Sequence, residues 1–151
     1  MAFCLALVVG LAFPTYSLPA EGKLIVVESF KTGNTELAVA HYAPTNRKGV
    51  GLIAIAAPAR NSFAFDLAEW KEVMVLCARA ASVKSDTMSV VGTMKETDIE
   101  DVSQISISAG PGMYFVITSP KAGKVFYTVP PPEFSRLQKG LFAVRDYLAQ
   151  E

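Results

Sequence analysis

Three basic residues, Arg47, Lys48 and Arg60, bracket one predicted strand of this 151-residue sequence. Together with Lys31 they could form a small positive patch that contacts a phosphate backbone, since cationic side chains displace the counterions of phosphates. So few charges give only modest, salt-sensitive affinity. These residues therefore indicate a binding surface, not catalytic chemistry.

Two tyrosines on predicted strands, Tyr42 and Tyr114, add aromatic rings to this set. An exposed ring on a sheet can stack with a nucleic-acid base of any kind, because every base has a π face. We expect both rings to be exposed. The candidate ligand-binding residues are thus Arg47, Lys48, Arg60, Tyr42 and Tyr114.

Catalytic chemistry has little support among the titratable residues. The only histidine, His41, lies on a predicted strand with Leu37 and Val39 on its face. A metal site or a catalytic triad needs partners, and the sequence has no second histidine and no Gly-x-Ser-x-Gly motif. We predict a structural or surface role for His41, no catalytic or metal-binding residue and no cofactor. A small enzyme that uses His41 with a carboxylate is the less supported alternative.

An acidic group, Glu96, Asp98, Glu100 and Asp101, has the residue types that bind calcium. Its spacing does not match an EF-hand loop and it lacks the central glycine, so we interpret it as a solvated connection. The glycine-rich stretch 109–112 joins two predicted strands and opens no helix. A tight turn is therefore expected there, not a phosphate site.

Alternating apolar residues, enriched in β-branched and aromatic types, predict four strands and then a helix in the first half of the chain. The predicted strands are 23–30, 36–42, 51–57 and 62–65. Gly33 and Asn34 tolerate positive φ and predict a hairpin turn between the first two. The helix is expected over 66–82, with Asp66 as its N-cap and Glu69 completing a capping box.

The second half of the chain repeats this order. The predicted strands are 87–93, 103–109, 113–119 and 124–129, and the last helix is expected over 131–149. Prolines open that helix at little cost, because the first turn has no use for their missing N–H groups. The sequence therefore predicts an α+β fold of antiparallel sheet packed against two helices, with an internal duplication as one explanation of the order.

Each predicted helix carries an apolar stripe with the same three, four, three spacing. The stripes are Trp70, Val73, Cys77 and Ala80 in the first helix and Phe134, Leu137, Leu141 and Val144 in the second. Amphipathic helices share such spacing by default, so chance is the alternative to duplication. We interpret Trp70 and Phe134 as core anchors and Cys77 as a small buried hydrophobe.

Short motifs are similar to those of a known family. Gly112, Met113, Tyr114, Phe115, Val116 and Ile117, followed by Val129, Pro130, Glu133 and Phe134, resemble the second half of a Whirly domain. Phe65 to Trp70 resembles the strand-to-helix junction of the related transcriptional positive-cofactor fold, and Arg47, Lys48 and Gly49 resemble its basic glycine turn.

The resemblance to the Whirly family of single-stranded-nucleic-acid-binding proteins covers most of residues 21–151 in element order. It implies a fold of two units of four strands and a helix. It also implies nucleic-acid binding through the five candidate residues, which is our alternative function. The chain departs from the family in lacking a Lys-Gly-Lys-Ala-Ala-Leu motif and a basic surplus. One fold hosts many functions, so the implication for fold is the stronger one.

The first twenty residues contain no charged side chain, and residues 3–13 are almost wholly apolar. This stretch is too short for a membrane-spanning helix but matches the apolar core of a secretory signal, with cleavage after Ser17 or Ala20. The predicted organisation is a signal peptide over 1–20 and a single α+β domain over 21–151. The alternatives are an additional N-terminal strand or a start codon assigned too early.

The location and the balanced charge set the expected function. The 14 Lys and Arg balance the 14 Asp and Glu, so no strong field attracts polyanions. We predict a periplasmic or secreted, non-enzymatic binding or assembly module for an unknown protein or small ligand, without a stable membrane span. The protein would be cytoplasmic if the leader is not cleaved. Self-association through a strand edge or through the helical faces is a further expectation.

Overall fold

In the part of the chain that the structure describes, eight strands and two helices form two successive units, each of four strands and one helix. The computed structural model describes residues 22–45, 48–56, 60–97, 102–120 and 123–150. The first unit comprises β1 (Gly22–Thr32), β2 (Thr35–Pro44), β3 (Val50–Ala56), β4 (Arg60–Phe65) and α1 (Leu67–Ser82). The second comprises β5 (Ser89–Thr97), β6 (Val102–Ala109), β7 (Met113–Ser119), β8 (Gly123–Val129), a short 3-10 turn η1 (Pro131–Glu133) and α2 (Phe134–Ala149).

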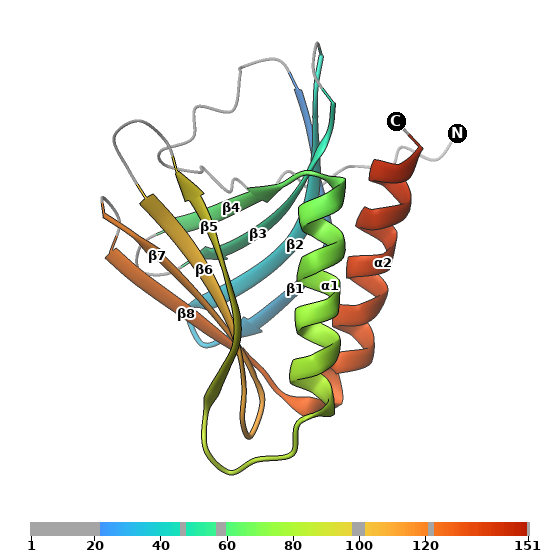
Figure 1. Ribbon diagram of the computed structural model, residues 1–151. Helices are drawn as coiled ribbons and strands as arrows, with labels where there is room; N and C mark the ends of the chain where they lie inside the picture. Colours follow the sequence, from blue (N-terminus) through green and yellow to red (C-terminus); the bar gives the residue numbers. More distant parts are fainter. Residues whose placement is uncertain (1–21, 46–47, 57–59, 98–101, 121–122, 151) are drawn as a thin grey trace.

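Each unit forms its own antiparallel sheet, in which the strand order follows the sequence. Sheet A has the order β1-β2-β3-β4, and sheet B has the order β5-β6-β7-β8. Figure 1 shows α1 and α2 lying side by side, next to the two sheets. Helix α1 contacts strands of both sheets, whereas α2 packs mainly on β1, β2 and β3. The predicted α+β class and its two four-strand-and-helix units are therefore confirmed.

The two units also share a local irregularity. The register between β1 and β2 shifts between Val26 and Glu28, and the register between β5 and β6 shifts between Val90 and Gly92. A bulge of this kind increases the local twist of an edge strand. The first strand of each unit therefore carries such an irregularity, a similarity that helical spacing alone does not explain.

The local signals in the sequence correspond to the observed turns and caps. Gly33 has a φ of 58°, which its missing Cβ allows, and it closes the β1–β2 hairpin. Asp66 accepts a hydrogen bond from the Glu69 backbone N–H at 2.8 Å, and the Glu69 carboxylate accepts one from the Asp66 N–H at 2.9 Å. This reciprocal pair is the predicted capping box, and it starts α1 at Leu67.

The core lies where the two helices meet the inner faces of both sheets. Trp70 is fully buried, its ring packs edge-on against Phe65, and its Nε1–H donates to the Leu141 carbonyl of α2 at 2.9 Å. Gly51 of β3 makes room for this ring, because a Cβ there would overlap the indole. Trp70 is thus the core anchor predicted from the sequence, while Phe134 is only half-buried at the edge of the core.

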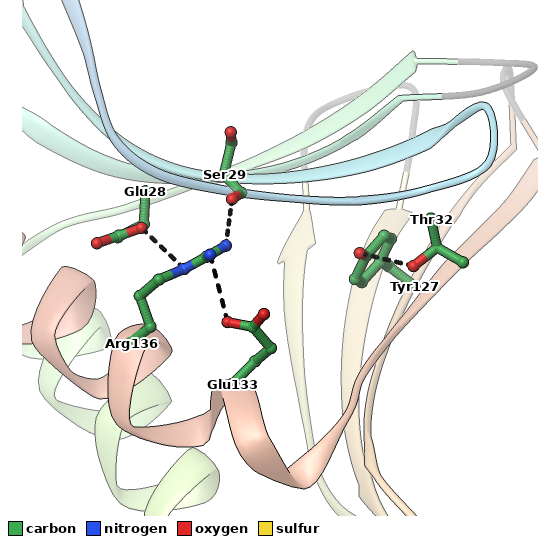
Figure 2. A network of polar contacts seen from close by, with 6 residues as sticks. All are labelled: Glu28, Ser29, Thr32, Tyr127, Glu133 and Arg136. Atoms are coloured by element: carbon green, nitrogen blue, oxygen red, sulfur yellow. Dashed lines mark hydrogen bonds and ion pairs between the residues drawn. The ribbon is translucent and has the colours of Figure 1, made fainter.

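The start of α2 is joined to β1 by Arg136 (Figure 2). Its guanidinium donates to the Ser29 carbonyl at 2.6 Å, pairs with Glu28 at 3.2 Å and with Glu133 at 3.3 Å. The same group lies 4.2 Å above the centre of the Phe30 ring. One side chain therefore connects the last helix of the second unit to the first strand of the first.

A hydroxyl pair connects the two sheets beside this junction. The Thr32 hydroxyl at the end of β1 and the Tyr127 hydroxyl of β8 lie 3.1 Å apart and share a hydrogen bond (Figure 2). Tyr127 is buried, so its hydroxyl needs such a partner. The end of the first hairpin is thereby held against the edge strand of sheet B.

Replacing Arg136 by methionine should lower the free energy of unfolding by about 1–2 kcal/mol, because the charged hydrogen bond to Ser29 and its ion pairs are lost. Urea denaturation followed by Trp70 fluorescence measures the change. Arg145 is the matched control, since it also pairs with a carboxylate, Asp146, and lies over a ring, Phe142, but within α2. Arg145→Met should change the stability by less than about 0.5 kcal/mol. Equal effects of the two substitutions would contradict the role of Arg136 as a tertiary connection.

Candidate functional site

Sheet B has one face in the core and one face toward solvent, because side chains alternate along each strand. Its inner face carries buried residues such as Ile107, Phe115 and Tyr127. The alternate residues form the opposite face, which we call the outer face of sheet B. It consists of Val90, Thr93, Lys95, Gln104, Ser106, Ser108, Tyr114, Val116, Thr118, Lys124, Phe126 and Thr128, all of them at least partly exposed except Ser108, which is buried. No carboxylate is among these residues.

The strand register aligns this outer face in rows that cross all four strands. One row has a lysine at each end and two uncharged polar residues between them: Lys95, Gln104, Thr118 and Lys124. Because neighbouring strands lie about 4.8 Å apart, the two lysines begin about 14 Å from each other. A second row is Thr93, Ser106, Val116 and Phe126, in which the hydroxyls of Thr93 and Ser106 lie 2.9 Å apart.

Large apolar side chains are unusually exposed on and beside this face. Phe126 is 64% exposed, Val90 is 63% exposed, and Met88, just before β5, is 58% exposed. Tyr114 is half-buried and lies diagonally across from Phe126, a relation that places Cβ atoms about 7–8 Å apart. Exposed apolar residues gathered on one face are typical of an interaction site.

A groove continues this face over the edge strand β8. It has a volume of about 320 Å³ and lies between β8 and the β1–β2 hairpin. Its lining combines Lys124, Phe126 and Thr128 of the outer face with Thr32, Thr35, Val125 and Tyr127. The Thr32–Tyr127 hydrogen bond therefore forms part of its wall. The candidate site is the outer face of sheet B together with this groove.

Sheet A presents a different outer face, and it contains Tyr42. Tyr42 is only 4% exposed and packs in a small apolar cluster with Ala40 and Leu52, which are 2% and 4% exposed. The expectation that Tyr42 is an exposed ring is therefore corrected. Among the described residues, the partly buried neighbours of this cluster are Leu24, Val50 and Ala64, so the surroundings of the ring are apolar.

The five candidate residues do not gather at one place among the described residues. Tyr114 belongs to the outer face of sheet B, whereas Tyr42 belongs to sheet A. Lys48 is exposed just before β3, and Arg60 begins β4, where its backbone pairs with Ala56. Arg47 lies outside the described residues.

The structure describes Lys31 but not most of the acidic group considered as a calcium site. Lys31, expected beside the basic residues, pairs with Glu36 at 3.5 Å across the first hairpin. That carboxylate offsets its charge locally. Asp98, Glu100 and Asp101 lie outside the described residues.

Sequence reasoning missed Phe126, Lys95 and Lys124. Their signal was present, because Lys124, Phe126 and Thr128 alternate with the buried Val125, Tyr127 and Val129 along one strand. The alternation identifies the outward side chains of β8. It does not identify Lys95 as a neighbour, because only the pairing of four strands places β5 on the same face.

A second cavity of about 280 Å³ lies between the two helices and has an apolar lining that includes Met74, Cys77, Phe134 and Leu141. Cys77 is buried, and burial raises the pKa of its thiol above the ordinary value, since a thiolate is poorly solvated there. A neutral thiol is a poor nucleophile and a poor metal ligand. Cys77 is thus the small buried hydrophobe expected from the sequence.

His41 lies on the inner side of β2 and is 7% exposed. Its ring stacks on that of Tyr147 in α2, with a centroid distance of 3.6 Å and an interplanar angle of 15°. This stacking joins β2 to the last turns of α2. His41 therefore has a structural contact, on the opposite face from the buried Tyr42.

Within the described part of the chain, no three residues with metal-binding side chains gather closely enough to hold an ion. No helix among the described residues combines the length and apolar character needed to cross a membrane. Comparison with known proteins found no matching family model and no matching curated protein.

The buried, neutral thiol of Cys77 should remain unmodified when the folded protein is treated with iodoacetamide at pH 8, because only an accessible thiolate reacts. In denaturant the same thiol should react fully. Peptide mass spectrometry measures Cys77 separately from Cys4. The raised pKa also makes the free energy of unfolding depend on pH. The neutral thiol favours the folded state below its unfolded pKa of about 8.5, and this contribution is lost as pH rises above that value. Rapid modification of Cys77 in the folded protein would contradict its burial.

Proposed function

We propose that this protein is a non-enzymatic binding module that holds its ligand across the outer face of sheet B. The observation that carries this proposal is the coincidence of exposed Phe126 and Val90 with Lys95 and Lys124 on a face whose described residues include no carboxylate. Exposed apolar area favours association, and the cations give that association a preference for negative charge.

Single-stranded nucleic acid is the ligand class that this face fits best. Such a ligand needs aromatic rings for its bases and positive or hydrogen-bonding side chains for its backbone. Phe126 and Tyr114 provide rings on adjacent strands, and Lys124 lies two residues from Phe126 on the same side of β8. The hydroxyl and amide side chains of Thr93, Gln104, Ser106 and Thr118 can donate to phosphate oxygens.

The resemblance to the Whirly family supports the same ligand class, and we propose membership of that fold group on this basis. Export remains a prediction from the uncharged N-terminal stretch. An exported module would meet proteins and small ligands more often than nucleic acid. An exported protein and a cytoplasmic one would thus bind different ligands on the same face. A measurement of nucleic-acid binding distinguishes these two possibilities.

Replacing Phe126 by alanine should weaken binding to a fluorescent 20-nucleotide oligo(dT) about 5- to 100-fold at 50 mM salt, because one base loses a stacking partner. Fluorescence anisotropy measures the dissociation constant. Phe142→Ala is the matched control, since Phe142 is 38% exposed but belongs to α2. Its removal should leave the affinity unchanged. If the unmodified protein shows no binding at this salt concentration, single-stranded nucleic acid is excluded as the ligand.

If the lysines contact phosphates, their replacement should reduce the salt dependence of oligo(dT) binding. Lys124→Gln should reduce the slope of log affinity against log salt by about 0.7, the value for one lost phosphate contact on a single strand. Lys139→Gln, on α2, is the control and should leave the slope unchanged. A slope that does not respond to Lys124 would assign the phosphate contacts to other residues.

A further inference from the structure

The two helices run in opposite directions, so the last turns of α1 lie beside the first turns of α2 (Figure 1). At the start of α1, Trp70 spans the distance between the helices and reaches the Leu141 carbonyl. In the second half of α1, the residues that face α2 include Ala78 and Ala81, whose side chains are too short to span the same distance. The space that they leave is the cavity of about 280 Å³ described above, which we call the interhelical cavity.

The lining of the interhelical cavity changes from buried to exposed. Its floor consists of four buried residues, which are Cys77, Met113, Leu137 and Leu141. Its sides are the half-buried Met74 and Phe134. Its mouth consists of exposed residues, which are Ala78, Ala81, Ser135, Gln138 and Phe142. A molecule in this cavity therefore has one end against an apolar floor and the other end near solvent.

The charge of the lining restricts what the cavity can hold. Among the lining residues that the structure describes, none carries a charge, because burial keeps the Cys77 thiol neutral. The polar side chains of the lining are Ser135 and Gln138, which lie three residues apart on α2 and therefore on one side of that helix. An ionised ligand would lose part of its hydration here without gaining a partner of opposite charge. The lining thus fits a neutral molecule whose polar group is at the mouth.

The volume of the cavity sets the size of that molecule. Protein interiors are close-packed and contain few voids larger than a water molecule, so a space of about 280 Å³ between two packed helices is unusual. An apolar cavity of about 150 Å³ stays free of water and takes up benzene, and the same ratio gives about eleven non-hydrogen atoms for this cavity. Met74 and Met113 have unbranched, flexible side chains that can adapt to such a molecule.

We propose that the interhelical cavity is a binding site for a neutral, largely apolar small molecule with one hydrogen-bonding group, of the size of a medium-chain alcohol. Its apolar part lies against Met113 and Leu141, and its polar group meets Ser135 and Gln138 at the mouth. This site shares no residue with the outer face of sheet B or with the groove beside β8. The inference is therefore independent of the proposed nucleic-acid ligand.

The methionines of the full chain test this proposal directly. Protein labelled with ¹³C in its methionine methyl groups is titrated with 1-octanol, a neutral alcohol of about the required size, and the methyl signals are followed by NMR. Met74 and Met113 line the cavity, so their signals should shift and reach saturation. Met88 and Met94 are the internal controls, because Met88 is 58% exposed and Met94 lies in the core away from the lining. Their signals should not shift.

Two variants separate the cavity from the rest of the helix surface. Ala78→Leu places an additional branched group in the mouth and should weaken octanol binding at least about tenfold, because the ligand and the leucine compete for the same volume. Ala143→Leu is the matched control, since Ala143 is an exposed alanine of α2 that does not line the cavity. It should leave the affinity unchanged. Octanoate, the ionised analogue, should bind at least about tenfold more weakly than octanol at pH 7.

Three results would overturn the proposal. Equal shifts at all four methionines would identify the effect as non-specific association with apolar surface. A lack of any shift at Met74 and Met113 would exclude a small apolar ligand. Signals of these two residues that change with protein concentration in the absence of octanol, and that octanol leaves unaltered, would assign the cavity to a second copy of the chain. Oligo(dT) binding, measured on the same full chain, reports on sheet B and is not decided by any of these results.

Discussion

The arrangement of the whole molecule depends on the burial of one side chain, Trp70. Its ring fills the space above Gly51, packs against Phe65, and donates its N–H to the Leu141 carbonyl of α2. A buried indole N–H without an acceptor would cost about 1–3 kcal/mol, so α2 is favoured in the one position that supplies this carbonyl. The second helix is therefore positioned by the first, and both are positioned by a glycine on β3.

The position of α2 also determines contacts at the edge strands β1 and β8. With α2 held against α1, Arg136 reaches Glu28 and the Ser29 carbonyl of β1 (Figure 2). The end of β1 then meets β8 through Thr32 and Tyr127. This contact encloses the groove beside Phe126. The first unit thus provides one wall of the candidate site, through Thr32, and the second unit provides its exposed aromatic ring, Phe126.

The two units are built alike and differ in the faces that they turn away from the core. Each has four antiparallel strands in sequence order, a bulge in its first strand and an amphipathic helix. One outer face is apolar and buried, and the other combines lysines and hydroxyls with an exposed phenylalanine. A repeated scaffold that needs only its inner faces for stability leaves the outer faces free to differ, so one can be structural while the other binds.

The sequence alone determined the secondary structure, because hydrophobic periodicity, turn glycines and helix caps are local signals. The predicted bounds of all eight strands and both helices agree with the observed ones to within a few residues, and 113–119 agrees with β7 at both ends. The capping box at Asp66, the anchor Trp70 and the buried Cys77 were likewise predictable. The candidate site was predictable only in Tyr114. Which outward side chains lie together depends on strand pairing across residues distant in the sequence, and that pairing brought Lys95, Tyr114 and Phe126 to one face. The tertiary structure also decided that Tyr42 is buried, since alternation tells which side a ring points to but not what covers it.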